Sequence, residues 1–351
     1  MPLWPAAAMS GGMQQTSPAG PSPVLFFDTV NGYQRSAALK GAVDLDLFTA
    51  IAEGDESVAA LARRCGAAER GVRILCDYLV IAGFLTKRDG RYVLTADSAT
   101  FLDRRSPAYL GGSLEFLLSP TILEGFRDVA AIARKGGTVL PEGGTMAPEH
   151  PVWVKFARAM MPVMAGPAEA LAALVDREAN RPIKVLDVAA GHGVFGIAFA
   201  RRNRDARVVA LDWPNVLEVA KENARAAGVA DRFSTVGGSA FDADPGRDYD
   251  VILLPNFLHH FDPPTCQRLL RRLRGALKPG GRAATLEFVP DEDRVNPPMA
   301  ASFALMMLSN TAAGDAYTFR ELESMFRNAG FSRSELHELP NTVQRAVISH
   351  T

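Results

Sequence analysis

The sequence predicts an α/β protein: a Rossmann-like doubly wound sheet with an antiparallel C-terminal hairpin, preceded by a mostly helical, winged-helix-like domain. Three observations support this fold class. From residue 182 onward, short β-rich runs alternate with helical stretches, which is typical of a parallel sheet covered on both faces. The first of these runs ends in a glycine-containing turn, Gly191-His192-Gly193, where such sheets bind ligands. The 351 residues also allow two domains of about 150 residues each.

Composition excludes several classes of protein. The formal net charge of -1 provides no basic field for nucleic acid or an anionic membrane. The three cysteines, Cys65, Cys76 and Cys266, are odd in number and widely spaced, which favours a reducing cytoplasm over a disulfide framework. The six histidines do not combine with cysteines at metal-ligand spacing, so no metal is expected. No apolar run reaches the length of about 18 residues that a membrane helix needs.

The N-terminal part divides into an extension and a helical domain. Residues 1–23 are rich in Pro, Gly, Ala and Ser and have no signal-peptide pattern, so they predict a disordered extension. We expect a winged-helix-like dimerisation domain over residues 24–135. Its first helical stretch, Val24–Gly54, carries apolar residues at every fourth position, which indicates one buried face.

The rest of this domain has the outline helix, turn, helix, hairpin. Two interpretations fit that outline. Arg70 and Arg73 on the second helix are compatible with DNA binding, whereas the mostly apolar character of that helix favours packing and dimerisation. The apolar stretch Pro107–Ala133 would extend a dimer interface. The expected segments are Ser57–Ala62, a turn at Gly66, Arg70–Ala82, Phe84–Thr86 and Arg91–Thr95 around a turn at Asp89-Gly90.

A linker and a substrate-lining helix are expected over residues 136–180. Gly136–Pro151 is rich in Gly and Pro, and a helix from Val152 to about Asp176 should be interrupted near Pro162 and Gly166. Residues 181–351 then form the sheet domain. Its predicted strands are Lys184–Val188, Arg207–Leu211, Phe233–Val236, Asp250–Leu254 and Arg282–Phe288, followed by a hairpin of Phe331–Leu339 and Val343–Ser349.

A nucleoside site is predicted after the first strand of the sheet. The small residues Ala189, Gly191 and Gly193 let the backbone approach a ligand closely, and a helix N-terminus follows them. Asp212, at the end of the second strand, can accept hydrogen bonds from both hydroxyls of a ribose. The turn also matches the G-x-G-x-x-G pattern of NAD-binding proteins. Asp187, inside the first strand, favours a ligand's ammonium group over a diphosphate, which it would repel.

At these residues the chain resembles the two-domain O-methyltransferases, the family of caffeic acid and acetylserotonin O-methyltransferases, in a bacterial-looking branch. Leu277-Lys278-Pro279-Gly280-Gly281 is a further feature of such enzymes. The resemblance implies S-adenosyl-L-methionine as cofactor, with S-adenosyl-L-homocysteine as product, and a homodimer whose N-terminal domains help to close the substrate pocket. The residues expected to bind the cofactor are Asp187, Ala189, Gly191, Gly193, Asp212, Trp213, Ser239, Ala240, Phe241 and Asn256.

The catalytic motif of this family resembles the segment from Asn256 to Asp262. The resemblance implies that His259 is the general base and that Glu287, 28 residues later, orients it. An imidazole can take the acceptor's proton at neutral pH, and a carboxylate on its other nitrogen stabilises the imidazolium. Alternatively, His259 caps the helix that starts near Pro263, and Glu287 is an ordinary strand-end carboxylate. We interpret His260 as a supporting or surface group.

Acceptor-lining residues also follow from the resemblance. Met160, Phe303, Met306 and Met307 fall where the family places its substrate pocket, although core packing is an alternative for the methionines. The chain departs from the family elsewhere. Ser239 replaces an acid near the adenine, Pro255 replaces a lysine, Phe261 replaces a tryptophan, and Ala316, beside Asp315, replaces a second catalytic glutamate.

The leading hypothesis is therefore a cytoplasmic enzyme that methylates a hydroxyl of a small aromatic or apolar metabolite, such as a compound of secondary metabolism. The same fold hosts N- and C-methyltransferases and relatives that do not transfer methyl groups. Two hypotheses from other classes are an NAD-dependent oxidoreductase and a DNA-binding regulator with a ligand-sensing domain. Neither nucleic acid nor a membrane is expected as a partner.

Overall fold

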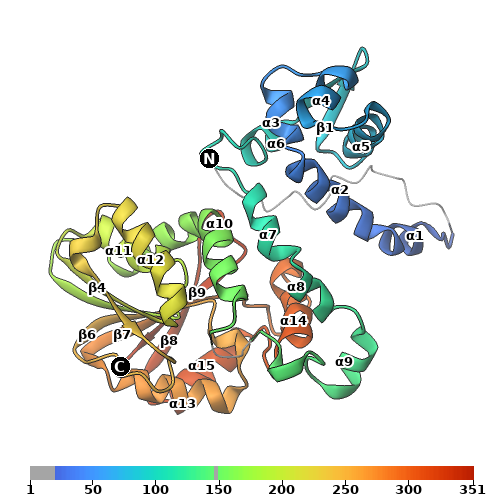
Figure 1. Ribbon diagram of the computed structural model, residues 1–351. Helices are drawn as coiled ribbons and strands as arrows, with labels where there is room; N and C mark the ends of the chain where they lie inside the picture. The colour runs from blue at the N-terminus through green and yellow to red at the C-terminus, as the bar shows by residue number, and fades with distance from the viewer. Residues whose placement is uncertain (1–19, 146–148) are drawn as a thin grey trace. The chain divides into compact units, whose positions relative to one another are not determined.

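The computed structural model describes residues 20–145 and 149–351 (Figure 1). The chain divides into two compact units, and the boundary along the sequence lies between Leu118 and Ser119. Most of the extension predicted for residues 1–23 lies outside the described residues. Within the described ranges, no helix is both long and apolar enough to cross a membrane.

The N-terminal unit begins with three helices where the sequence predicts one stretch. They are α1 (Val24–Val30), α2 (Gly32–Asp44) and α3 (Leu47–Ala52). The break before α3 has a local cause, because Asp46 adopts a left-handed conformation with φ of 55°, which a continuous right-handed helix cannot contain. The change of direction lets α3 bury Leu47 and Phe48 in the core of this unit.

The winged-helix outline is confirmed by α4 (Val58–Cys65), α5 (Glu69–Ile81), β1 (Leu85–Arg88) and β2 (Arg91–Leu94). Ser57 begins α4 because its hydroxyl accepts a hydrogen bond from the Ala60 amide. Asp89 and Gly90 both have positive φ, which a tight antiparallel hairpin requires.

Short helices lie on both sides of the boundary between the two units in the sequence. The apolar stretch predicted over Pro107–Ala133 is divided by turns, and its C-terminal part packs on α14 (Pro298–Asn310). That packing places these helices in the second unit, so the boundary lies before residue 119, whereas the sequence suggests residue 135. The segments are α6 (Ala96–Phe101), η1 (Gly111–Ser113), α7 (Leu114–Leu117), α8 (Pro120–Gly125), α9 (Val129–Lys135) and η2 (Pro141–Gly143).

The second unit contains a seven-stranded sheet in the order β5-β4-β3-β6-β7-β9-β8. The first five strands in this order are parallel, and β9 and β8 add an antiparallel edge, as predicted. The order reverses between β3 and β6, which is where such sheets bind ligands. The strands are β3 (Ile183–Val188), β4 (Ala206–Asp212), β5 (Phe233–Gly237), β6 (Tyr249–Pro255), β7 (Leu277–Glu287), β8 (Arg333–Glu338) and β9 (Arg345–His350).

Helices cover both faces of this sheet (Figure 1). On one face, α10 (Val152–Val175), α11 (Val194–Arg202) and α12 (Pro214–Ala226) contact one another. On the other face, α13 (Pro263–Arg274) packs against α15 (Phe319–Asn328). Two single turns, η3 (Ala230–Arg232) and η4 (Leu258–His260), complete the unit.

The helix α10 corrects one expectation. We predicted an interruption near Pro162 and Gly166, but α10 runs unbroken for 24 residues with Pro162 and Pro167 inside it. A proline in a helix interior costs about 3 kcal/mol. Tertiary packing outweighs this cost here, because α10 buries residues such as Met164 and Leu171 along its length and contacts both α11 and α12.

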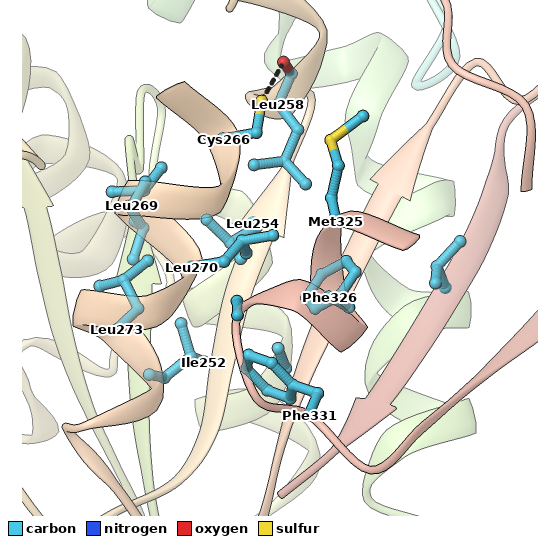
Figure 2. Packing of buried hydrophobic residues seen from close by; sticks show 14 of the residues in the cluster. Ile252, Leu254, Leu258, Cys266, Leu269, Leu270, Leu273, Met325, Phe326 and Phe331 are labelled. Carbon is cyan, nitrogen blue, oxygen red and sulfur yellow. Dashed lines mark hydrogen bonds between the residues drawn. The ribbon is translucent and has the colours of Figure 1, made fainter. Parts of the chain in front are cut away.

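The core beneath the catalytic segment joins β6, α13 and α15. Figure 2 shows Leu254 of β6, Leu270 of α13 and Phe326 of α15 pointing toward one another. Cys266 of α13 also donates its thiol hydrogen to the Leu258 carbonyl at 3.3 Å. This core therefore supports the turn that follows β6.

Replacement of Leu270 by Ala is expected to destabilise this unit by about 2–5 kcal/mol, because it leaves a cavity in a close-packed core. Urea unfolding followed by circular dichroism measures the change. Arg268→Ala, at an exposed position on the same helix, is the control and should change stability by less than about 0.5 kcal/mol. Equal effects of the two changes would contradict this description of the core.

A candidate active site at the carboxyl edge of the sheet

The turn after β3 has an unusual backbone. Ala189, Gly191 and Gly193 all have positive φ, at 53°, 57° and 72°. A Cβ on Gly193 would lie 3.0 Å from the Cβ of Ala220, a tighter contact than side chains normally make. The turn lies at the carboxyl edge of the sheet, ahead of the N-terminus of α11, and Gly191 and Gly193 are both buried there.

Asp187 is fully buried in β3 beneath this turn. Its Oδ2 accepts a hydrogen bond of 2.9 Å from the Gly196 amide, while its Oδ1 has no partner. Burial raises the pKa of this carboxyl to about 7, and the nearby charge of Asp212 adds to the effect. The site therefore holds an acid whose charged form lacks a counter-charge, and a cationic ligand group would supply one.

Asp212 ends β4 and ties the two neighbouring loops together. Its Oδ2 accepts a 2.7 Å hydrogen bond from the Gly191 amide, and its Oδ1 accepts one of 2.6 Å from the Trp213 amide. Burial raises the pKa of Asp212 to about 6. Each oxygen keeps a further lone pair, so the carboxylate can accept additional hydrogen bonds from hydroxyl groups.

The other residues predicted to bind the cofactor follow β4, β5 and β6 at the same edge. Trp213 packs with Trp153 against helix α12, and the Ser239 hydroxyl accepts a 3.1 Å hydrogen bond from the Phe241 amide. Ala240 is buried, and Phe241 meets the ring of Phe261 edge-on at 5.0 Å. Asn256, directly after β6, directs its side chain toward Gln344 and Met164.

His259 and Glu287 come together as predicted. His259 lies in η4 and Glu287 ends β7, and both are almost completely buried. The His259 Nδ1 is hydrogen-bonded to the Glu287 Oε2. Because an ionised carboxylate can only accept at this contact, Nδ1 is the nitrogen that carries the hydrogen when the imidazole is neutral, and Nε2 then has the lone pair.

The second oxygen of Glu287 holds the backbone of the same turn. Its Oε1 accepts hydrogen bonds from the amides of Phe257 at 3.0 Å and Leu258 at 2.9 Å. The helix-capping alternative for His259 is wrong, because Asp262 caps α13 through a 2.7 Å hydrogen bond from the Thr265 amide. Glu287 is also more than a strand-end carboxylate, because it holds both the His259 ring and the backbone of the turn.

Packing fixes the plane of the His259 ring. Phe303 meets it edge-on at 4.9 Å, and Phe288 stacks on the other side of Phe303 at 4.0 Å. On the backbone side, a Cβ on Gly314 would lie 2.2 Å from the His259 carbonyl oxygen, so only glycine fits there. The Asp315 amide donates a hydrogen bond to that same carbonyl.

The residues predicted to line the acceptor lie on α10 and α14. Met160 and Met307 are buried, and Met306 and Phe303 are half-buried. Phe303 contacts the His259 ring directly, while the Met306 sulfur accepts a weak hydrogen bond of 3.4 Å from the side-chain Nδ2 of Asn310. Asp315, beside the position of the family's second glutamate, instead forms an ion pair with Arg294 at 3.3 Å.

Sequence reasoning assigned no role in the site to His192 and only a supporting or surface role to His260. His192 is buried, stacks on Phe156 at 5.8 Å, and has an Nε2 without a partner; burial lowers its pKa to about 4. His260 lies 4.3 Å from His259 and 5.2 Å from Trp153 between ring centroids, and burial lowers its pKa well below the ordinary value. A histidine in a motif carries no local signal of burial, so only the fold could show that His192 and His260 are buried near the site.

Over residues 20–145 and 149–351, no group of three or more His, Cys, Asp or Glu side chains is arranged to hold a metal ion.

Comparison with known proteins identifies relatives over most of the chain. A family model described as an O-methyltransferase domain matches residues 150–332, and one described as an O-methyltransferase dimerisation domain matches residues 27–104. The 3-hydroxy-5-methyl-1-naphthoate 3-O-methyltransferase of Streptomyces sahachiroi is 31% identical over 92% of this chain and 93% of its own.

Solved structures agree. A structure from Nostoc punctiforme, provisionally assigned as an O-methyltransferase, is 57% identical, with a TM-score of 0.92 over 95% of this chain and 100% of its own. Human N-acetylserotonin methyltransferase, solved with S-adenosylmethionine, shares the fold, with a TM-score of 0.83 at 23% identity over 95% of this chain and 99% of its own.

The raised pKa of Asp187 predicts a pH dependence of stability. The ligand-free folded state holds a proton on Asp187 up to about pH 7, whereas the unfolded chain releases it near pH 3.8. The stabilising contribution is therefore complete below about pH 4 and is lost as the pH rises to about 7. Relative to the wild type, Asp187→Asn should thus gain stability over this range, by up to about 1 kcal/mol per pH unit.

Urea unfolding of both proteins without ligand, at several pH values between 5 and 8, measures this difference. Asp205→Asn, at an exposed position, is the matched control and should show no such trend. A difference between Asp187→Asn and wild type that does not change with pH would contradict the assigned protonation of Asp187.

Proposed function

Since the chain belongs to the S-adenosylmethionine-dependent O-methyltransferases, we propose that His259 is the general base that removes the acceptor's hydroxyl proton. The observation that supports this most directly is the buried His259–Glu287 pair. With Nδ1 hydrogen-bonded to the carboxylate, Nε2 is free to take the proton, and the imidazolium that forms is stabilised by Glu287. When bound, S-adenosylmethionine supplies a methyl group that is already electrophilic because its sulfur is positively charged.

The residues at the turn after β3 fit this cofactor. Asp187 has an unpartnered buried oxygen that a nearby ammonium group would compensate, and Asp212 has free lone pairs for two ribose hydroxyls. The positive φ values of Ala189, Gly191 and Gly193 let the backbone come close to the ligand. We assign Trp213, Ser239, Ala240 and Phe241 to the rest of the nucleoside site.

The acceptor is proposed to be a small aromatic molecule with a hydroxyl group. Met160, Met306, Met307 and Phe303 offer it an apolar wall, and thioether sulfurs pack well against aromatic rings. A base that takes a proton favours a hydroxyl over an amine that is already nucleophilic. The hydroxynaphthoate named for the Streptomyces sahachiroi relative has this chemistry.

The N-terminal unit is proposed to form a homodimer. It matches a dimerisation domain, and its α1 exposes an apolar surface: Leu25 is 79% exposed, Phe26 64% and Phe27 56%. Exposed apolar surface of this kind marks an interaction site. The DNA-binding alternative has little support, because α5 buries Val72, Cys76 and Leu79 and so is part of the core of its own unit.

The role of His259 is tested by His259→Gln beside Asp212→Asn. Transfer of a labelled methyl group from S-adenosylmethionine to 3-hydroxy-5-methyl-1-naphthoate and a panel of other phenols measures turnover, and calorimetric titration with S-adenosylhomocysteine measures binding. His259→Gln should lower kcat about 10²–10⁴-fold and leave binding unchanged. Asp212→Asn should weaken binding.

Matched amino compounds separate oxygen from nitrogen acceptors. Transfer to the amines but to none of the phenols would overturn the hydroxyl assignment. Full turnover by His259→Gln would overturn the base.

The dimer is tested with Phe26→Glu/Phe27→Glu, which places two charges on the apolar face of α1. Sedimentation velocity at micromolar concentration should show a dimer for the wild type and a monomer for this variant, because burying unpaired charges is costly. Arg88→Glu, at an exposed hairpin position, should remain dimeric. A monomeric wild type would contradict the proposal.

A further inference from the structure

The loop between β8 and β9 supplies a side chain to the catalytic turn. Gln344 precedes β9, and its Nε2 donates a hydrogen bond to the Oδ1 of Asn256, the residue that directly follows β6. We propose that Gln344 is a positioning residue for methyl transfer, which acts through Asn256 on the His259–Glu287 pair. This inference rests on the function proposed above for that pair.

Asn256 has a backbone conformation that needs support. Its φ is 54°, in the left-handed region that costs a residue with a side chain about 1–2 kcal/mol. Asparagine tolerates this region better than most residues, because its short amide can hydrogen-bond locally. The backbone N–H of Asn256 donates a 2.8 Å hydrogen bond to the Leu286 carbonyl, so β6 stays paired with β7 up to this residue.

The reversal at Asn256 sets the direction of the next two peptide groups. The amides of Phe257 and Leu258 both point at the Oε1 of Glu287, and His259 then reaches the Oε2. If the chain at Asn256 turned in the ordinary right-handed direction, these two amides would leave the carboxylate. The conformation of Asn256 and the alignment of the base are therefore coupled.

Gln344 is placed to control that conformation. It is only 2% exposed, and its own backbone amide is held by the Thr342 hydroxyl at 3.1 Å. The next residue, Arg345, lies opposite Glu287 in the register of β9 with β7. The antiparallel strand thus begins next to the end of β7 that carries Glu287, and Gln344 immediately precedes it.

Both polar atoms of the Asn256 side chain have protein partners. The Oδ1 accepts from Gln344, and the Nδ2 lies 3.6 Å from the Met164 sulfur of α10. The side chain expected from sequence to bind the cofactor is therefore assigned to holding the turn. Loss of the Gln344 donor would leave a buried oxygen unsatisfied and free the turn to relax.

The test begins with Gln344→Met, which keeps the length of the side chain but removes the donor. With the hydroxynaphthoate or whichever phenol the wild type methylates, kcat should fall about 10–100-fold, as expected for a misplaced base. The acceptor KM and the affinity for S-adenosylhomocysteine should stay close to wild type, and the unfolding midpoint should fall by no more than one unsatisfied buried oxygen accounts for. A kcat equal to that of the wild type would overturn the proposal.

Charge variants test whether the contact itself matters. Gln344→Glu should keep activity, because the Asn256 amide can turn and donate to the carboxylate. Asn256→Asp keeps an acceptor for the Gln344 donor, so its kcat should fall less than that of Gln344→Met. The double variant places two carboxylates together without a donor at neutral pH, so its kcat should fall far below the product of the single effects. Additive effects would contradict a direct contact.

A readout independent of the acceptor distinguishes this proposal from the function it rests on. In the protein bound to S-adenosylhomocysteine, the hydrogen on His259 Nδ1 should give a far-downfield proton resonance, identified by its loss in His259→Gln. Gln344→Met should shift or broaden it, and Asn256→Asp, which keeps the acceptor for Gln344, should change it less. If the wild type methylates none of the phenols, only the proposed function is contradicted. If the resonance is unchanged in Gln344→Met, only the positioning role of Gln344 is contradicted.

Discussion

The buried carboxylate of Glu287 is the interaction on which the rest of the site depends. One side chain accepts hydrogen bonds from His259 and from two successive backbone amides, so it defines both the ring and the turn that carries it. Its own position is held by β7, which is paired with a parallel strand on one side and an antiparallel strand on the other. A buried carboxylate needs such partners, because burial without them is costly.

The part of the site proposed to bind the nucleoside has different electrostatics. Asp187 and Asp212 lie under the turn after β3, and burial raises the pKa of both carboxyls. The charge of Asp212 adds to the rise in the pKa of Asp187. A cationic group placed nearby would favour the ionised form of these acids, which is consistent with the cofactor-binding role proposed for them. The His259–Glu287 pair, in contrast, is formed by the protein's own groups.

Local sequence predicted most of the sheet because the residues of each strand themselves favour the extended, buried conformation. Runs of β-branched and aliphatic residues locate β3, β4, β5 and β6 to within two residues. Failures occurred where packing overrides local preference. The prolines of α10 predicted a break, but the helix is continuous because it is packed along its length, and α8 and α9 join the second unit because they pack on α14.

The sequence by itself predicted the family and the two-domain order, and it indicated Asp187, Asp212, His259 and Glu287 as candidate site residues, because these lie in motifs with characteristic spacing. Only the tertiary structure decided which groups meet across long distances in the chain. Gln344 reaches Asn256 across 88 residues, and His260 meets Trp153 of a different helix. Neither contact has a local signal, since a glutamine in a loop or a second histidine in a motif has no fixed partner until the strands and helices have packed.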